Sequence, residues 1–144
     1  MEKVEKEISK QIVEKRVRDW KKRLADLYST IKLWLKDSEY TLMLGPKLPM
    51  FEGLMSQFHI PATEVDTADV YKNKNFMLAI KPRGLWVVGA NGRIDILTTK
   101  GNYTLVDFAE QFKTPHWTLF NGDKNNGVEF NKQSFFTASK VTFA

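Results

Sequence analysis

The chain has 144 residues and a formal net charge of +5, and its apolar and charged fractions are those of an ordinary folded domain. No apolar run approaches the ~18 to 20 residues of a membrane span, and the polar N-terminal residues lack the apolar stretch of a secretory signal. Without cysteine there is no disulfide, thiol nucleophile or cysteine zinc site. We therefore expect one cytoplasmic domain over residues 1–144, with no membrane span.

The first segment of the chain predicts a long helix. Residues from about 2 to 36 contain no Gly or Pro and are rich in Glu, Lys, Leu and Arg. Apolar residues recur there at spacings of four and three over three heptads, which favours another helix as the partner. Such a helix would be ~50 Å long. We therefore expect one end to extend beyond the rest of the domain and to pack against another copy of the chain in a homo-oligomer. The seam consists of Val13, Val17, Trp20, Leu24, Leu27, Ile31 and Trp34.

The other side of this helix is basic. Residues 1–37 hold 11 Lys and Arg against 7 Asp and Glu, whereas residues 38–144 hold 11 against 10, so most of the positive charge lies in the first segment. This face could hold phosphates, an acidic protein surface or an anionic membrane face; the alternative is a solvated face of mixed charge. Its cations are Lys15, Arg16, Arg18, Lys22 and Arg23, interrupted by Asp19 and Asp26.

After this helix, Tyr40 to Leu44 form a strand candidate that stops at Gly45-Pro46. The apolar residues between Phe51 and Phe58 have the i, i+3, i+4, i+7 spacing of a short amphipathic helix. Residues 62–75 are polar and predict a surface connection.

Asn91-Gly92 lies between two apolar, β-branched runs and predicts a two-residue type I′ hairpin. Its flanking strands would be Leu85–Ala90 and Arg93–Thr99, preceded by a strand at Phe76–Lys81 and followed by one at Asn102–Val106. In this register Leu85, Val87 and Gly89 share a core face with Ile94, Ile96 and Thr98. Trp86, Val88 and Ala90 share a mixed face with Arg93, Asp95 and Leu97, which is either covered by a helix or holds a ligand.

The last third of the chain is less regular. Leu105 to Phe112 has helical spacing with Asp107 as a plausible cap, so a strand there could give way to a short helix. His116–Phe120, Val128–Phe130 and Phe135–Phe143 predict strands around a loop at 121–127. The fold we predict is α+β: a long N-terminal helix (1–37) packed on an antiparallel sheet of five to seven strands (38–144), with one or two short helices.

The sequence contains no motif that identifies a catalytic residue, a metal site or a cofactor. His59 and His116 have no metal-ligand spacing, and no Gly-rich phosphate loop is present. One cluster of aromatic and polar residues would suit a small ligand or a flipped-out base, and it would form if the last strands lay beside the hairpin. An aromatic core with a buried histidine is the alternative. The residues of this possible ligand face are Trp86, Arg93, Asp95, His116 and Trp117.

The function we predict is a non-catalytic interaction module. It would form a homo-oligomer through the helix seam and bind an anionic partner, either nucleic acid or an acidic protein, through the basic helix face. Two alternatives remain open. One is a small-ligand-binding protein or enzyme that uses the sheet face around Trp86, and the other is an inhibitor or immunity-type protein that covers another protein.

Overall fold

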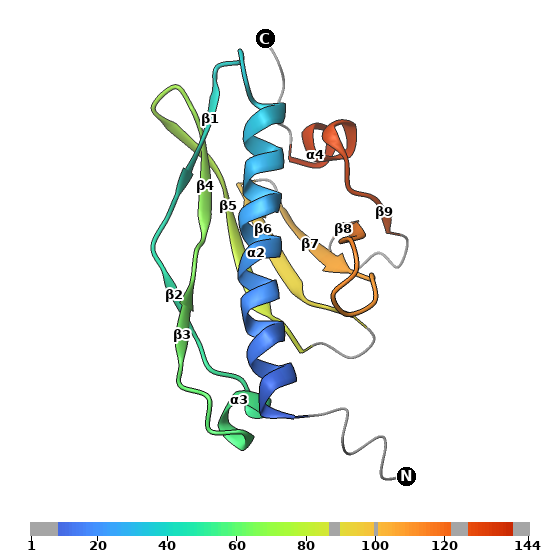
Figure 1. The fold of residues 1–144 in the computed structure, drawn as a ribbon. Coiled ribbons are helices and arrows are strands. Elements are labelled where there is room, and N and C mark those ends of the chain that lie inside the picture. The colour runs from blue at the N-terminus through green and yellow to red at the C-terminus, as the bar shows by residue number, and fades with distance from the viewer. Residues whose placement is uncertain (1–8, 87–89, 100, 122–126, 140–144) are drawn as a thin grey trace.

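One long helix, α2, lies across one face of an antiparallel sheet in the computed structural model (Figure 1). The structure describes residues 9–86, 90–99, 101–121 and 127–139. The predicted α+β fold, with its long N-terminal helix on an antiparallel sheet, is confirmed. The helices are α2 (Lys10–Trp34), α3 (Gly53–Gln57) and α4 (Lys132–Ser139). The strands are β1 (Tyr40–Leu44), β2 (Leu48–Met50), β3 (Thr63–Val65), β4 (Ala68–Lys72), β5 (Asn75–Gly84), β6 (Arg93–Thr98), β7 (Gly101–Asp107), β8 (Trp117–Asn121) and β9 (Val128–Glu129).

The main sheet has seven strands in the order β1-β4-β5-β6-β7-β8-β9, and every neighbouring pair is antiparallel. From β4 onward the chain adds one strand after another. The excursion between β1 and β4 contains α3 and a separate pair formed by β2 and β3. Strands β1 and β9 therefore form the two edges of the main sheet.

Helix α2 buries its seam against its own sheet. Ser9 caps its N-terminus, because the Ser9 hydroxyl accepts a hydrogen bond of 3.2 Å from the Ile12 N–H. Six of the seven seam residues are buried, and Trp34 is half-buried against the rings of Phe130 and Phe135. The expectation of a helix as the packing partner is wrong, because an apolar stripe of this spacing fits a sheet face equally well. The part of the predicted helix before residue 9 lies outside the described residues.

The sheet has a core face toward α2 and an outer face away from it. Ile94, Ile96 and Leu105 are fully or almost fully buried on the core face, as the alternation in β6 predicts. On the outer face, Arg93 and Asp95 form an ion pair, with 3.3 Å between Arg93 Nε and Asp95 Oδ1. None of the described helices covers this outer face (Figure 1).

The predicted two-residue hairpin at Asn91-Gly92 is wrong. Strand β5 runs to Gly84, which pairs with Arg93, so the connection spans residues 85–92. Of the predicted strand Leu85–Ala90, residues 87–89 lie outside the described part of the chain. Glu52 holds the start of this connection, because its carboxylate accepts hydrogen bonds from the N–H groups of Leu85 (2.9 Å) and Trp86 (3.2 Å).

Gly92 has a different role from that of a turn residue. Its φ is +135°, and a Cβ at this position would overlap the indole ring of Trp20 on α2. The backbone is thus bound closely under the helix, and Asp107 on β7 exchanges two backbone hydrogen bonds with Asn91 and Gly92. The glycine is required for close packing of the connection under α2, and the short-range turn signal was misleading.

Two other segments differ from their predicted structure. The polar segment 62–75 contains β3 and β4, because buried Val65, Ala68 and Val70 alternate with polar residues. The predicted strand Phe135–Phe143 is helical as far as Ser139, and residues 140–144 lie outside the description. Asn131 starts this helix, since its side chain accepts from the Ser134 N–H at 2.9 Å.

The structure also resolves the ambiguous stretch after β7. The strand ends at Asp107, and residues 108–113 form turns in place of the short helix that the spacing of Leu105 to Phe112 suggested. Asp107 still accepts a hydrogen bond from the Ala109 N–H. Its main partner, however, is an arginine on α2.

Tyr28 on α2 is expected to make the folded protein less stable at alkaline pH. Burial raises the pKa of its phenol far above the usual 10.0, and the hydroxyl donates to the Asp66 carbonyl oxygen at 2.7 Å. Above pH 10 the unfolded chain therefore loses a proton that the folded chain keeps, so the free energy of unfolding falls as pH rises. Urea titrations from neutral to alkaline pH should show a shallower fall for Tyr28→Phe; an equal slope in both proteins would contradict this account.

Candidate functional site

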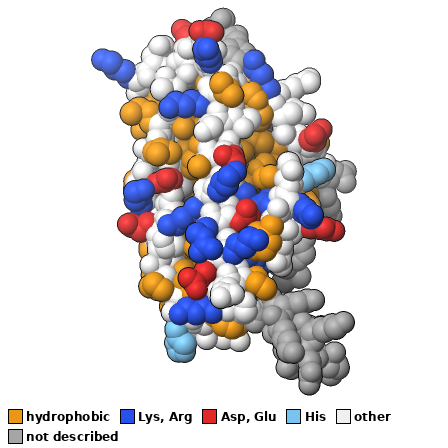
Figure 2. Space-filling model, in the orientation of Figure 1, with side chains coloured by type: hydrophobic (Ala, Val, Ile, Leu, Met, Phe, Trp, Pro, Cys, Tyr) orange, Lys and Arg blue, Asp and Glu red, His pale blue; other side chains and the backbone are white. Residues whose placement is uncertain are grey.

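The exposed side of α2 carries a dense group of cations, which we call the basic face. Of the residues predicted from sequence, Lys15, Arg18 and Lys22 are exposed there. Only one exposed carboxylate, Asp26, lies on the described length of α2. Figure 2 shows the Lys and Arg side chains gathered along the middle of this side of the molecule. The full set of exposed cations is Lys10, Lys15, Arg18, Lys21, Lys22 and Lys32.

The cations of the basic face differ in how firmly they are held. Lys22 Nζ lies 3.0 Å from Asp26 Oδ2, and both side chains are exposed, so the pair contributes little to stability. The Lys15 ammonium lies 4.2 Å from the centre of the Phe112 ring. Arg18 forms no ion pair with any residue in the described ranges. Its guanidinium is therefore available to a partner, and it lies between Lys15 and Lys22 near the middle of the basic face.

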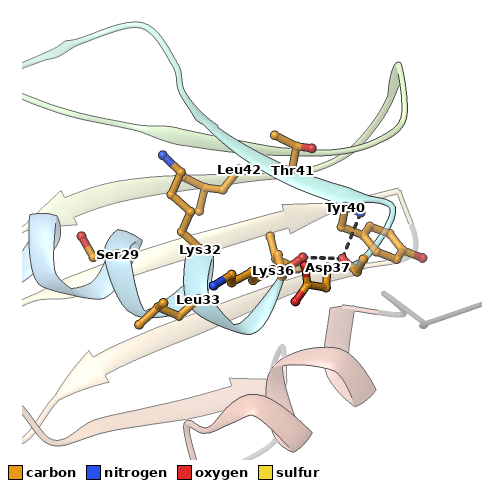
Figure 3. Close-up of a pocket in the computed structure, with 10 residues that line it drawn as sticks. Ser29, Lys32, Leu33, Lys36, Asp37, Tyr40, Thr41 and Leu42 are labelled. Atoms are coloured by element: carbon orange, nitrogen blue, oxygen red, sulfur yellow. Dashed lines mark hydrogen bonds between the residues drawn. The ribbon is translucent and has the colours of Figure 1, made fainter.

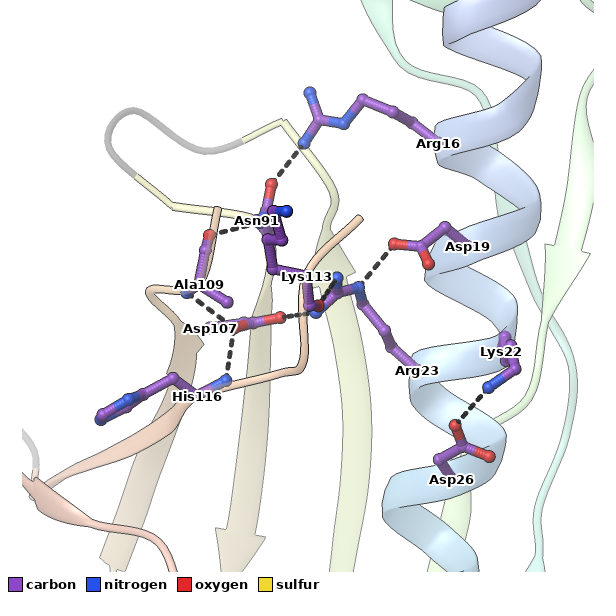
Figure 4. A network of polar contacts seen from close by, with 10 residues as sticks. All are labelled: Arg16, Asp19, Lys22, Arg23, Asp26, Asn91, Asp107, Ala109, Lys113 and His116. Carbon is purple, nitrogen blue, oxygen red and sulfur yellow. Dashed lines mark hydrogen bonds and ion pairs between the residues drawn. The ribbon is translucent and has the colours of Figure 1, made fainter. Parts of the chain in front are cut away.

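Arg23, which the sequence placed on the basic face, is instead buried, with a relative exposure of 4%. Its guanidinium donates to Asp107 Oδ2 at 2.6 Å and to Asp19 Oδ2 at 2.5 Å, and a third bond reaches the Lys113 carbonyl oxygen (Figure 4). Asp107 is fully buried. The prediction that Arg23 contacts an external anion loses its basis, because its charge is compensated inside the protein.

The Asp107 side chain also holds the two ends of the loop that follows it. Its Oδ1 accepts hydrogen bonds from the N–H groups of Ala109 (3.0 Å) and His116 (2.9 Å), while its Oδ2 faces Arg23. No buried side-chain nitrogen or oxygen among the described residues lacks a hydrogen-bond partner. The network thus joins α2, the end of β7 and the segment before β8 (Figure 4).

Arg16 is partly buried and contacts other residues of the protein. It donates to Asn91 Oδ1 at 3.1 Å, and its guanidinium carbon lies 5.3 Å from the centre of the Trp86 ring. Partial burial lowers the pKa of Arg16, and the nearby carboxylates of Asp19 and Glu52 oppose this effect. Arg16 therefore serves mainly to attach the connection before β6 to α2.

The residues of the possible ligand face do not share one surface. Arg93 and Asp95 lie on the outer face of the sheet, where Asp95 also pairs with Arg83 at 2.8 Å. Trp117 lies on the core side, with its ring 6.2 Å from that of Trp20. Trp86 lies beside Arg16, and His116 is exposed. The structure therefore does not bring these side chains to a common ligand.

A groove between α2 and the edge strand β1 was not predicted. It consists of two adjoining hollows of about 630 Å³ and 440 Å³, which share Ser29, Lys32 and Leu42. Figure 3 shows the first hollow, with Lys32 of α2 and Lys36 of the following turn on one wall and residues of β1 on the other wall. Leu33, Met43 and Leu44, all more than half exposed, lie along this groove or beside it. We call it the α2–β1 groove.

The sequence carried a signal for some of these residues. Lys32 and Leu33 follow from the same helical wheel that located Arg18 and Lys22, since the wheel places them away from the seam. Nothing in the sequence indicated that β1 would be an edge strand. Strand order is set by pairings between distant segments, which a single sequence does not display.

The described residues include no group of three or more His, Asp or Glu side chains placed to hold a metal ion. None of the helices in that part of the chain is both long and apolar enough to cross a membrane. No protein-family model, curated protein or solved structure matches this chain.

Proposed function

We propose that this chain is an interaction module whose basic face binds an anionic partner. The observation that supports the proposal is the imbalance on the exposed side of α2, where six cations accompany one exposed carboxylate. Like charges held along one rigid helix raise the local potential and attract an extended anion more strongly than scattered charges do. Nucleic acid and acidic protein segments both have this character.

Burial changes the composition of the proposed contact surface. Arg23 is neutralised internally and Arg16 is bound to Asn91, so neither is free for a partner. Lys21 adds a charge in the middle of this surface, and Lys32 extends it into the C-terminal half of α2. The seam is buried in the core, so it is not the surface of a homo-oligomer. A homo-oligomer remains a prediction and would have to use another surface.

Charge reversal at Arg18 is expected to weaken binding to polyanions. We expect Arg18→Glu to lower the affinity for labelled duplex DNA, duplex RNA or polyglutamate by about tenfold at low salt, because a repulsive charge replaces an attractive one at the centre of the basic face. Fluorescence anisotropy over a salt series measures this. For a nucleic acid, the slope of log affinity against log salt should also become shallower.

Lys74→Glu is the matched control for this variant. Lys74 is exposed in the turn between β4 and β5, away from α2, and its reversal changes the net charge by the same amount. If Lys74→Glu weakens binding as much as Arg18→Glu, the effect comes from net charge and the basic face has no special role. If the unmodified protein binds none of the three polyanions at low salt, the proposed function is wrong.

A further inference from the structure

We propose that the α2–β1 groove binds an extended acidic segment of a partner protein, which adds to the free edge of β1 as a further strand. This inference rests on the proposed function, because it names the class of anionic partner and the place where its chain lies. Three features of the described residues support it: the backbone geometry of β1, the exposed apolar side chains beside it, and the lysines that line the groove.

The pairing of β1 with β4 shows which backbone groups face outward. The Asn73 N–H donates to the Glu39 carbonyl oxygen, and the Gly45 N–H donates to that of Thr67. In an antiparallel pair, hydrogen-bonded positions alternate with positions whose N–H and C=O groups point away from the partner strand. The backbone groups of residues 39, 41, 43 and 45 therefore bond toward β4, whereas those of residues 40, 42 and 44 point to the free edge.

Two of these outward positions are open to a new strand. The Tyr40 N–H already donates to the Ser38 hydroxyl at 3.1 Å, which closes that end of the edge. Leu42 and Leu44 remain, and their N–H and C=O groups repeat at the spacing that an added strand requires. The positions lie beside the groove, since Leu42 lines both of its hollows and Leu44 lines the second.

The two edges of the main sheet differ in how they are protected. Strand β9 has only two residues, which is too short to guide another strand. Strand β1 has five residues, Tyr-Thr-Leu-Met-Leu, with no charge and no proline. Proteins usually protect an edge of this kind with Lys, Pro or a bulge, because it otherwise pairs with another chain. The absence of charge and proline from β1 is consistent with a strand that has a partner.

The side chains beside this edge are unusually apolar for a surface. Leu44 points to the same side as buried Leu42 but is 60% exposed, because α2 does not cover it. Leu33 on α2 is 70% exposed and lines the groove. An added strand would place every second side chain into the groove, where it would cover these leucines. Apolar residues at alternate positions of the segment are therefore expected.

The charges of the groove favour an acidic segment. Lys32 on α2 and Lys36 in the turn after α2 line the groove, and Figure 3 shows both side chains there. Asp66 at the far end is already paired with Lys47 at 2.6 Å, which leaves Asp37 as the opposing carboxylate. Carboxylates of the segment would thus meet lysines that continue the basic face. A second copy of this chain fits less well, because edge-to-edge pairing would bring two sets of these lysines together.

Leu44→Pro tests the added strand directly. Proline removes the N–H that points to the free edge, and it leaves the bonds between β1 and β4 in place. A library of random 12-residue peptides displayed on phage is selected against the immobilised protein, and one enriched peptide is synthesised with a fluorescent label. We expect enrichment of sequences in which apolar residues alternate with Asp or Glu, and an affinity about tenfold lower for Leu44→Pro.

Leu44→Val is the matched control, since it keeps the N–H and an apolar side chain and should change the affinity by less than about threefold. Protection of the Leu42 and Leu44 amides from hydrogen exchange when peptide binds would support strand addition. The inference is overturned if enriched peptides lack carboxylates, if both variants bind equally well, or if Leu44→Pro abolishes a self-association of the unmodified protein. Binding of nucleic acid that depends on Arg18 but not on Leu44, without peptide binding, would overturn it and leave the proposed function standing.

Discussion

Replacing Asp107 by alanine is expected to lower the free energy of unfolding by about 3–5 kcal/mol, because the carboxylate is one member of a buried ion pair. The substitution removes the partner of a guanidinium that is itself 4% exposed, together with the acceptor for the Ala109 and His116 N–H groups. The cost arises mostly from leaving Arg23 charged and buried without compensation. Urea denaturation followed by circular dichroism measures the change.

Asp95→Ala is the matched control for this substitution. Asp95 also pairs with arginines, Arg83 at 2.8 Å and Arg93 at 3.3 Å, but both arginine side chains are about half exposed. Water screens these charges, so we expect a loss of about 1 kcal/mol or less. Similar losses in Asp95→Ala and Asp107→Ala would contradict the importance of burial.

The double variant Arg23→Met/Asp107→Leu separates the charge from the hydrogen bonds. With both charges gone, no uncompensated ion remains, so part of the stability lost in Asp107→Ala should return. The recovery should be incomplete, because the Ala109 and His116 N–H groups still lack their acceptor. A double-mutant cycle built on these two positions gives the coupling energy between them. A coupling energy near zero would show that the pair is not an interacting unit.

The sequence alone was sufficient to predict the elements in which the apolar residues follow a clear pattern. The seam of α2, the strand Tyr40–Leu44 and the alternation of Ile94 and Ile96 all came from one-dimensional patterns, and each is present in the structure. These patterns report which side of an element is apolar. They do not report what covers that side, and for this reason the periodicity of α2 pointed to a second helix although its seam packs on the sheet.

The segments that were wrongly predicted depend on distant partners. Asn91-Gly92 has the local composition of a tight turn, but Trp20 and Asp107 determine its conformation from far along the chain. Phe135 belongs to an aromatic run with high strand propensity, yet it is helical and packs against Trp34. Local propensity spans about 1 kcal/mol per residue, so the burial of one large aromatic side chain outweighs it.

The candidate site was only partly predictable, because some of its residues depend on distant parts of the chain. The helical wheel correctly separated Arg18 and Lys22 from the seam, because exposure on a helix follows the angle around its axis. It could not exclude Arg23, whose burial depends on a carboxylate 84 residues away in the sequence. The α2–β1 groove exists only because β1 forms an edge, a property of strand order that appears when the whole sheet is assembled.

Gly92→Ala is expected to lower the free energy of unfolding by about 2–4 kcal/mol. Two effects add at this position. A φ of +135° is a conformation that residues with a side chain rarely adopt, and the new methyl group would overlap the ring of Trp20. Trp20 has a relative exposure of 1% and is packed beside Trp117, so its ring has little space to move. Urea denaturation measures the loss.

Gly101→Ala distinguishes the two effects. Gly101 has a similar backbone conformation, with φ +151°, but none of the described residues comes within 4 Å of the position that a Cβ would occupy. This control therefore carries the conformational cost alone, about 1–2 kcal/mol. The additional loss in Gly92→Ala should shrink when Trp20 is replaced by the smaller phenylalanine, because the overlap is then relieved. If the two alanine variants lose the same stability, the contact between Gly92 and Trp20 does not explain why a glycine is needed there.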